Sequence, residues 1–293
     1  MNASGPAPVL TVKPAGSQPA SLVSLLMPWR IVRDLRRHGS LILQFTKRDV
    51  LVRYRGSYLG VFWSLLRPLC TLAVFGVVFG YIFQSRLSND PNESKVDFAM
   101  ALFCGLSMLD FISECLGRAP TLILMNSNYV TKVVFPLEVL PVSVAVAAIV
   151  HLIVSLIPLA AAYLVVHHTL HMTALYIPLI VIPLFFLGLG IAWLFSSLGV
   201  FIRDINSLVP VLLLILMYCS AIFYRMSKVP PQLRFIVHYN PLAVLVDNLR
   251  DVFMWGLPVD WGQFGLMTLV CFAIMLVGYA FFMRTKSAFA DVI

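Results

Sequence analysis

The sequence has few charged residues and few cysteines, and both scarcities limit what the chain can be. Only 12% of its 293 residues are Asp, Glu, Lys or Arg, whereas 60% are hydrophobic. A soluble domain of this length could not hide so much apolar surface in one core. The five cysteines stand singly in or beside apolar runs and never as CxxC, which argues against a disulfide framework or a zinc site. The composition predicts a polytopic membrane protein.

Motifs of catalysis are also missing. The sequence contains no GxxxxGK[ST], no GxSxG and no HExxH, so we expect neither a nucleotide-hydrolysing site nor a catalytic, cofactor or metal site. The histidines of the HHTLH turn (His167, His168 and His171) have no adjoining Cys or acidic residue, and an exposed turn is the favoured interpretation. If the chain moves cargo against a gradient, the energy must come from an ion or from a second polypeptide.

Acidic residues are outnumbered, which gives a net charge of +8. The cations cluster beside apolar runs, a pattern typical of the positive-inside bias of membrane proteins and not of nucleic-acid binding. Nine of them precede Phe62. We therefore predict a multi-pass membrane protein with both termini in the cytoplasm.

Long apolar runs define six candidate spans, since crossing the hydrocarbon takes roughly 20 apolar residues. They are about Phe62–Phe83, Phe98–Leu116, Leu140–Val166, Ala174–Phe201, Ile205–Phe223 and Phe264–Phe282. The predicted fold is thus an all-α integral membrane protein with six transmembrane helices. We divide it into a disordered extension (1–28), a basic interface helix (29–60), a permease domain (61–286) with a cytoplasmic loop at 118–138, and a cytoplasmic tail (287–293).

Two segments lie at the membrane surface. In a helical projection, Leu41–Leu59 has apolar residues on two sides. This pattern fits a basic flank of the first span whose long side chains reach the membrane surface, or a helix that packs between lipid and a partner protein. Residues 224–260 contain an apolar stretch too short to span, read as external re-entrant helices with Asp247, Arg250 and Asp251 toward water. A seventh span there would place the C-terminal cations on the wrong side.

Polar residues at membrane depth are functional candidates because they are costly there. Asp110, Glu114 and Arg118 share one helical face at i, i+4, i+8 spacing, which indicates an ion-pair ladder facing the bundle. The alternative is a proton relay. His151 is interpreted as a hydrogen-bonded core histidine.

Four motifs in fixed order resemble one known family. The stretches KRDVLVRYRGSYLGVFWSLLRPL, NSNYVTKVVFPLEVLP, FIRDIN and YNPLAVLVDNLRDVFMWG are similar to those of ABC-2 type permeases that export bacterial surface polysaccharides. O-antigen and teichoic acid exporters are the nearest resemblance, and capsule exporters are more distant. The likeness covers about Leu41 to Lys286.

The resemblance implies a homodimer that associates with two copies of a cytoplasmic ATPase, which binds the ATP and Mg²⁺, and that encloses a channel for a lipid-linked polymer. The gate helix then maps onto a basic and aromatic set: Lys47, Arg48, Arg53, Tyr54, Arg55, Tyr58, Trp63, Arg67 and Pro68. The residues that couple to the ATPase map onto two cytoplasmic turns: Asn126, Asn128, Tyr129, Lys132, Phe135, Pro136, Arg203 and Asp204. Candidate channel aromatics are Trp63, Phe75, Phe79, Tyr218 and Phe223, with an interfacial aromatic belt as the alternative.

Two functions of other classes stay open. An ion-coupled secondary transporter would use Asp110 or Glu114, and inverted repeats, which we do not find, would favour it. A membrane-embedded transferase would need a catalytic acid or histidine pair at an interface.

Overall fold

The computed structural model describes residues 27–52, 62–82, 95–131 and 135–293, and every regular element in these ranges is helical. The α-helices are α2 (Pro28–Arg37), α3 (Gly39–Val52), α4 (Trp63–Phe75), α5 (Lys95–Met125), α6 (Ser127–Thr131), α7 (Val139–His167), α8 (Ile177–Phe201), α9 (Ile205–Cys219), α10 (Arg234–His238), α11 (Pro241–Arg250), α12 (Trp261–Thr285) and α13 (Phe289–Val292). Two π-helical segments, η2 (Gly76–Ile82) and η5 (Asp251–Trp255), and three 3-10 turns, η3 (Met172–Tyr176), η4 (Met226–Lys228) and η6 (Lys286–Ala288), complete them.

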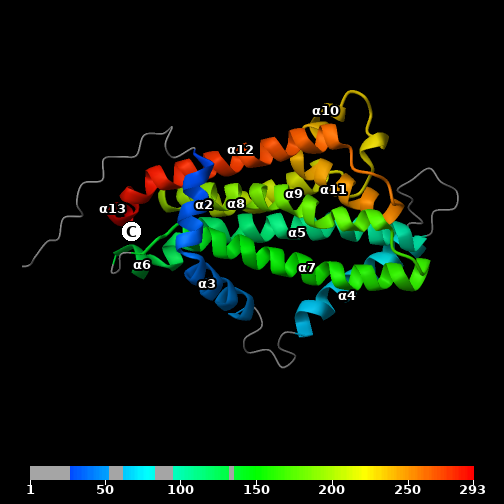
Figure 1. Cartoon of the computed structure of the whole chain (residues 1–293), viewed down its shortest axis with the longest axis horizontal. Coiled ribbons are helices and arrows are strands. Elements are labelled where there is room, and N and C mark those ends of the chain that lie inside the picture. Colours follow the sequence, from blue (N-terminus) through cyan, green and yellow to red (C-terminus); the bar gives the residue numbers. More distant parts are fainter. Residues whose placement is uncertain (1–26, 53–61, 83–94, 132–134) are drawn as a thin grey trace, which may run out of the picture.

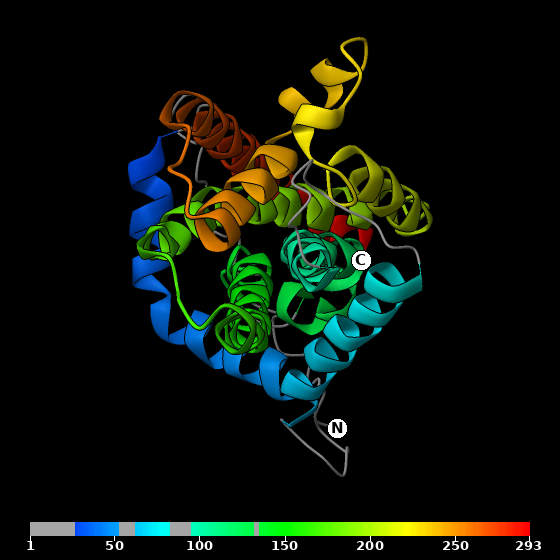
Figure 2. The same ribbon diagram turned by 90° about the vertical axis from the view of Figure 1, so that its right-hand side faces the viewer.

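Four long helices, α5, α7, α8 and α12, run side by side along the long axis of the molecule (Figure 1). Within the described residues, four stretches are long and apolar enough to cross a membrane: Val96–Met125, Val139–His167, Met172–Phe201 and Trp261–Val292. The end-on view shows the N-terminal helices α2, α3 and α4 wrapped around this bundle (Figure 2). The prediction of an all-α integral membrane protein is confirmed.

A close helix contact joins α8 and α12. A Cβ placed on Gly278 would stand 2.3 Å from the backbone oxygen of Gly190, so only glycine allows this approach. Small residues at crossing points let the backbones of membrane helices pack closely, which yields dispersion contacts that lipid does not provide. This contact aligns the last long helix with the core.

Two apolar helices are shorter than the rest. Leu65–Val78 and Ile205–Cys219 have apolar composition but less than the length of a full span. At 1.5 Å per residue, the 15 residues of α9 cover about 22 Å, whereas the hydrocarbon is about 30 Å thick. The six-span count therefore stays a prediction.

The structure adds detail to three predicted segments, whose bounds stay predictions. The basic interface segment contains two helices in its described part, α2 and α3; α2 ends at Arg37, and Nδ1 of its C-cap residue His38 lies 2.9 Å from the backbone oxygen of Asp34. The predicted cytoplasmic loop begins within a helix, because α5 continues to Met125 and buries Ile123. The C-terminal tail packs on the bundle, since Phe289 is fully buried.

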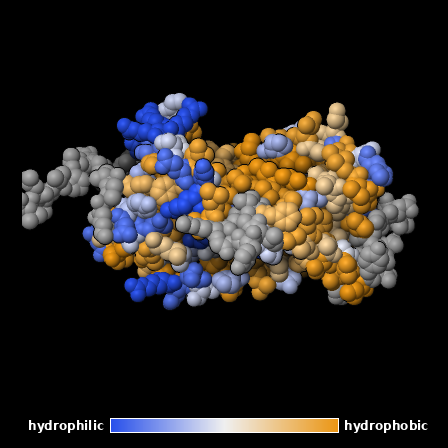
Figure 3. All heavy atoms as spheres, turned by 90° about the horizontal axis from the view of Figure 1, so that it is seen from below, coloured by the Kyte–Doolittle hydropathy of each residue, from blue (hydrophilic) through white to orange (hydrophobic). Residues whose placement is uncertain are grey.

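Polar surface gathers at one end of the molecule. Figure 3 shows hydrophilic residues concentrated at the end that carries α2, while hydrophobic surface covers most of the remaining length. The C-terminus lies at this same end (Figure 1). An even number of crossings would place the two ends of the described chain together in this way.

The expectation that Arg250 faces water is wrong. Its side chain is fully buried and donates hydrogen bonds to the carbonyl oxygens of Ala101 at 2.7 Å, Ala221 at 2.7 Å and Ile222 at 2.5 Å. Burial lowers the pKa of Arg250 to about 10, so the guanidinium stays charged at neutral pH. Because five fixed N–H donors suit several carbonyls at once, this side chain fastens α11 to α5 and to the turn after α9.

Candidate coupling site

An aromatic cluster fastens α3 to the segment that follows α5. The ring of Phe45 lies 5.7 Å from that of Tyr129 in α6 and 5.4 Å from that of Phe135, centroid to centroid. Tyr129 and Phe135 stack on each other at 4.7 Å. Such aromatic pairs contribute about 0.5–1.5 kcal/mol each beyond the area they bury. A displacement of α6 would therefore displace α3 as well.

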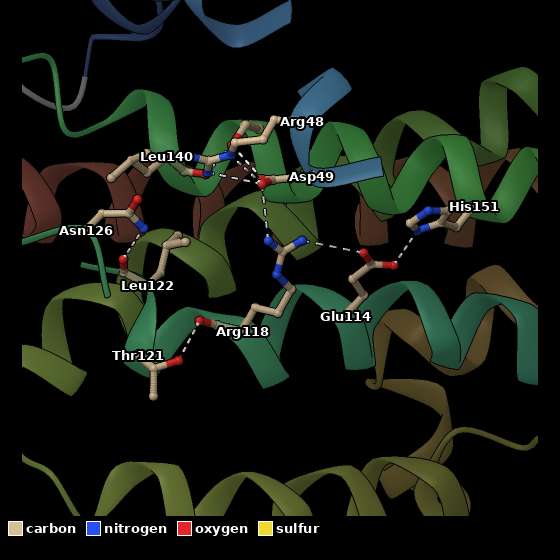
Figure 4. A network of polar contacts seen from close by, with 10 residues as sticks. Arg48, Asp49, Glu114, Arg118, Thr121, Leu122, Asn126, Leu140 and His151 are labelled. Carbon is tan, nitrogen blue, oxygen red and sulfur yellow. Dashed lines mark hydrogen bonds and ion pairs between the residues drawn. The ribbon is translucent and has the colours of Figure 1, made fainter. Parts of the chain in front are cut away.

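One turn further along α3, Asp49 forms a polar contact with the bundle (Figure 4). This residue is only 7% exposed. Its carboxylate lies 3.2 Å from the Ser143 hydroxyl of α7, which shares its proton with the Leu140 carbonyl at 2.8 Å, and 3.4 Å from a guanidinium nitrogen of Arg118 in α5. Arg48, its neighbour in sequence, donates to the same carboxylate at 3.1 Å. Asp49 thus joins α3, α5 and α7.

The polar contacts continue from Asp49 into the bundle. Arg118 reaches back along α5 to Glu114, with 3.8 Å between nitrogen and oxygen, in the i, i+4 relation that the spacing predicts. The other carboxylate oxygen of Glu114 lies 2.8 Å from Nδ1 of His151 in α7. Figure 4 shows this line of side chains from Arg48 through Asp49, Arg118 and Glu114 to His151. Residues of three helices thereby form one connected network.

Charge balance suggests what this network can do. The two carboxylates of Asp49 and Glu114 face the two guanidinium groups of Arg48 and Arg118. Ions in a weakly polar interior are costly unless they are paired and hydrogen-bonded, so the paired arrangement holds the three helices in one register. Packed helices joined in this way move as units when one of them is displaced.

A second group of polar contacts holds α2 and the segment after α12 against the bundle. The hydroxyl of Tyr279 in α12 donates to Asp34 of α2 at 2.7 Å. Lys286, just after α12, pairs with Glu138 at 2.6 Å, and the indole of Trp193 donates to the Glu138 carbonyl at 3.2 Å. Both helices of the N-terminal segment therefore contact the bundle through an acidic side chain.

The predicted coupling residues fall mainly around α6. Asn126 donates to the Leu122 carbonyl at 2.8 Å and closes the end of α5, while Tyr129 contacts Phe135. Asn128 is exposed in α6, Pro136 lies just before α7, and Lys132 lies outside the described residues. Arg203 and Asp204 are exposed in the turn between α8 and α9. That turn is at the same end as the C-terminus, because neighbouring Phe201 lies 5.9 Å from Phe289.

The predicted gate residues are divided between two helices. Lys47 is exposed and Arg48 half-buried in α3, and Trp63, Arg67 and Pro68 lie in α4, where only Pro68 is buried. The remaining four lie outside the described residues: Arg53, Tyr54, Arg55 and Tyr58.

The candidate channel aromatics lie in α4 and around the end of α9. Trp63 is exposed, Phe75 is half-buried, and the exposed Tyr218 lies 5.8 Å from the ring of Phe223. The side chain of Phe79 is outside the described part of the chain. Their role in a channel stays a prediction.

Asp110, the first residue of the predicted ladder, is exposed and lines a cavity of about 520 Å³ between α4, α5 and α7. Glu114 and His151 line the same cavity. Within the described residues, no group of three or more His, Cys, Asp or Glu side chains is arranged to hold a metal ion.

Asp34, Phe45 and Asp49 are not among the site residues predicted from the sequence. Asp34 and Asp49 are the acidic residues of a segment with nine cations before Phe62. An acid retained in so basic a segment signals a specific partner, because a surface adapted to anionic lipid would exclude it. No comparable signal distinguishes Phe45 from other apolar residues.

Comparison with known proteins agrees with this architecture. The family model described as ABC-2 type transporter matches residues 40–254, from the start of α3 to η5. The chain belongs to the ABC-2 type transporter family. This confirms the resemblance and makes the chain a membrane transport subunit, whose match includes α3, α6 and the whole polar network.

Individual relatives of this ABC-2 chain carry related descriptions. An O-antigen export system permease protein RfbA of Klebsiella pneumoniae is 27% identical over 255 residues, covering 86% of this chain and 95% of that one. A protein of the same description from Myxococcus xanthus is 25% identical, with coverage of 76% and 84%. The polysialic acid transport protein KpsM of Escherichia coli is 21% identical, with coverage of 82% and 92%.

Proposed function

We propose that this chain is the permease subunit of an ATP-driven exporter that moves a lipid-linked, O-antigen-like polysaccharide across the bacterial cytoplasmic membrane. The RfbA relatives support this substrate class because they match at higher identity than KpsM. A capsular polysaccharide is the second candidate. ATP and Mg²⁺ belong on a separate ATPase subunit, because the sequence has no phosphate-binding GxxxxGK[ST] loop.

The contact between α6 and α3 carries the mechanistic part of the proposal. Tyr129 of α6 meets Phe45 of α3, and Asp49 of α3 meets Arg118 of α5. An ATPase that displaces α6 would thus move α3, and the contact between Asp49 and Arg118 would pass this displacement on to α5. In this proposal α6 receives the ATPase and α3 is the gate helix.

We further propose six spans with both termini in the cytoplasm. The short helices α4 and α9, continued by the residues beside them, supply the two spans beyond the four long helices. In this arrangement α10 and α11 form the external re-entrant segment, and Met1–Pro28 form an extension outside the permease domain.

A homodimer is the proposed assembly. Large apolar side chains are exposed on α9, namely Leu208, Val211, Leu214, Ile215 and Tyr218, and on α4, namely Trp63, Leu69 and Val74. A second copy packed against these helices would enclose the aromatic side chains of α4 and of the α9 end. Flat aromatic rings suit a sliding polymer, because they stack on the apolar faces of sugars without fixed hydrogen bonds.

Complementation in cells tests this function. A strain deleted for the chain is supplied with the wild type, Tyr129→Ala, Phe45→Ala or, as control, Tyr239→Ala, which removes an exposed tyrosine next to α10. We expect wild type and control to restore surface polysaccharide, and both cluster variants to reduce it at equal membrane abundance. Full export by both cluster variants would contradict the coupling role, and no loss of surface polysaccharide in the deleted strain would contradict the function.

A further inference from the structure

The cavity between α4, α5 and α7 has the composition of a binding site. Its volume of about 520 Å³ lies within the range of roughly 300–1,000 Å³ found for small-molecule sites. The side chains on its wall include two carboxylates, a cation, an imidazole and an indole, together with hydroxyl groups such as that of Ser107: Asp110, Glu114, Arg67, His151 and Trp63. Of these, the polar network described above uses only Glu114 and His151.

The position of Asp110 favours a hydrated cavity. It lies near the middle of α5, a helix apolar enough to span the membrane, and its side chain is nevertheless exposed. A carboxylate facing lipid at such a depth costs several kcal/mol, so polar residues there face a water-filled space or a bundle interior. Because Asp110 lines the cavity, its exposed carboxylate belongs to that space.

Ser107 supplies an independent indication of a ligand. It stands three residues before Asp110, on the same face of α5, and also lines the cavity. Its residue is 3% exposed, and its hydroxyl has no hydrogen-bond partner among the residues that the structure describes. A buried hydroxyl without a partner costs about 1–3 kcal/mol, which a hydrogen bond from a ligand would recover.

The combination of groups favours a ligand that is rich in hydroxyls and has an apolar ring face. Carboxylates accept strong, charge-assisted hydrogen bonds from hydroxyl groups, and the indole of Trp63, 44% exposed, offers an apolar face to a ring. Glu114 is already paired with Arg118 and lies 2.8 Å from His151. Asp110 and Ser107 are therefore the wall side chains that we expect to meet the hydroxyl groups of a ligand.

We propose that this cavity binds a sugar ring of the exported glycan, with Asp110 and Ser107 as hydrogen-bonding ligands and Trp63 as a stacking surface. The proposal rests on the function proposed above and adds to it a site within one protomer. Because Glu114 lines the cavity and also contacts Arg118, a bound sugar lies next to the network that seats α3.

Photolabelling of the full chain in lipid nanodiscs tests the site without ATP or a partner. The probes are dodecyl glycosides of glucose, rhamnose and N-acetylglucosamine with a diazirine next to the headgroup, and a control probe with the same chain and a phosphocholine headgroup. Labelled peptides are mapped by mass spectrometry in the wild type, Asp110→Asn, Ser107→Ala and Ser196→Ala. Ser196 is the matched control, because it is a buried serine of α8 without a described hydrogen-bond partner and is not on the cavity wall.

We expect at least one glycoside to label residues 103–114 or 148–155, the phosphocholine probe to leave them unlabelled, and Ser196→Ala to behave as wild type. Loss of one ligand hydrogen bond corresponds to a decrease of roughly 3- to 10-fold, larger for Asp110→Asn than for Ser107→Ala. Labelling that is independent of headgroup, absent for all glycosides or unchanged in both cavity variants would overturn the proposal. Because export is assayed separately, a failure of export with labelling intact would count against the proposed function and not against the site.

Discussion

Removing the Asp49 carboxylate should uncouple α3 from the bundle. Breaking a fully buried ion pair costs about 3–5 kcal/mol. The side chains of Arg118 and Arg48 are 37% and 40% exposed, however, so solvent screens part of the interaction. For Asp49→Asn we therefore expect the free energy of unfolding to fall by about 1–3 kcal/mol, including the weakened bond to Ser143.

A double-mutant cycle isolates the contact between helices. The variants are Asp49→Asn, Arg118→Gln and their combination, unfolded by sodium dodecyl sulfate in mixed micelles and followed by tryptophan fluorescence. We expect an interaction energy of about 1 kcal/mol between the two positions, because their charged atoms lie 3.4 Å apart. A parallel cycle with Asp49→Asn and Asp260→Asn serves as control, since exposed Asp260 caps α12. If the changes in the free energy of unfolding at Asp49 and Arg118 added within about 0.3 kcal/mol, the proposed contact between α3 and the bundle would be refuted.

Three further predictions concern other parts of the fold. Gly278→Ala should destabilise the chain by about 1–3 kcal/mol through the clash with α8, whereas Gly265→Ala, with open space around its Cβ, should be neutral or stabilising by up to about 1 kcal/mol in the same unfolding assay. Arg250→Met should cost more than about 3 kcal/mol or prevent folding, because three buried carbonyls lose their donor, and retention of wild-type stability would contradict its structural role. Burial, aided by the neighbouring Asp247, raises the pKa of Asp251 to about 6, so the folded chain binds more protons than the unfolded chain between about pH 4 and pH 6. The contribution of Asp251 to the free energy of unfolding should therefore fall as pH rises through that window. Hydrogen-exchange protection of α11 measures this effect and should depend less on pH in Asp251→Asn.

Much of the bundle could be predicted because its signals are local. The runs that form α7, α8 and α12 are long, apolar and bounded by polar residues, so their lengths alone indicate membrane helices. The pairing of Glu114 with Arg118 follows from helical spacing within one element. The aromatic and basic character of the segment before Phe62 likewise indicated a membrane-surface helix.

The contacts between distant elements could not be predicted in the same way. The hydrogen bond between Ser143 and Asp49 joins residues 94 positions apart, and no periodicity relates them. The expectation for Arg250 failed for a related reason. Charged residues near a helix end usually face water, but here the carbonyls that satisfy Arg250 come from a turn and a helix that only the tertiary fold brings together.

We propose that this chain exports a lipid-linked polysaccharide when a separate ATPase acts on α6. Co-reconstitution of the chain with its ATPase subunit in liposomes that carry lipid-linked polysaccharide tests this proposal, with polymer movement followed by protection from an added glycosidase. We expect ATP-dependent movement that requires both subunits and is lost in Tyr129→Ala. Movement driven by an ion gradient without the ATPase, or no movement with both subunits and ATP present, would contradict it.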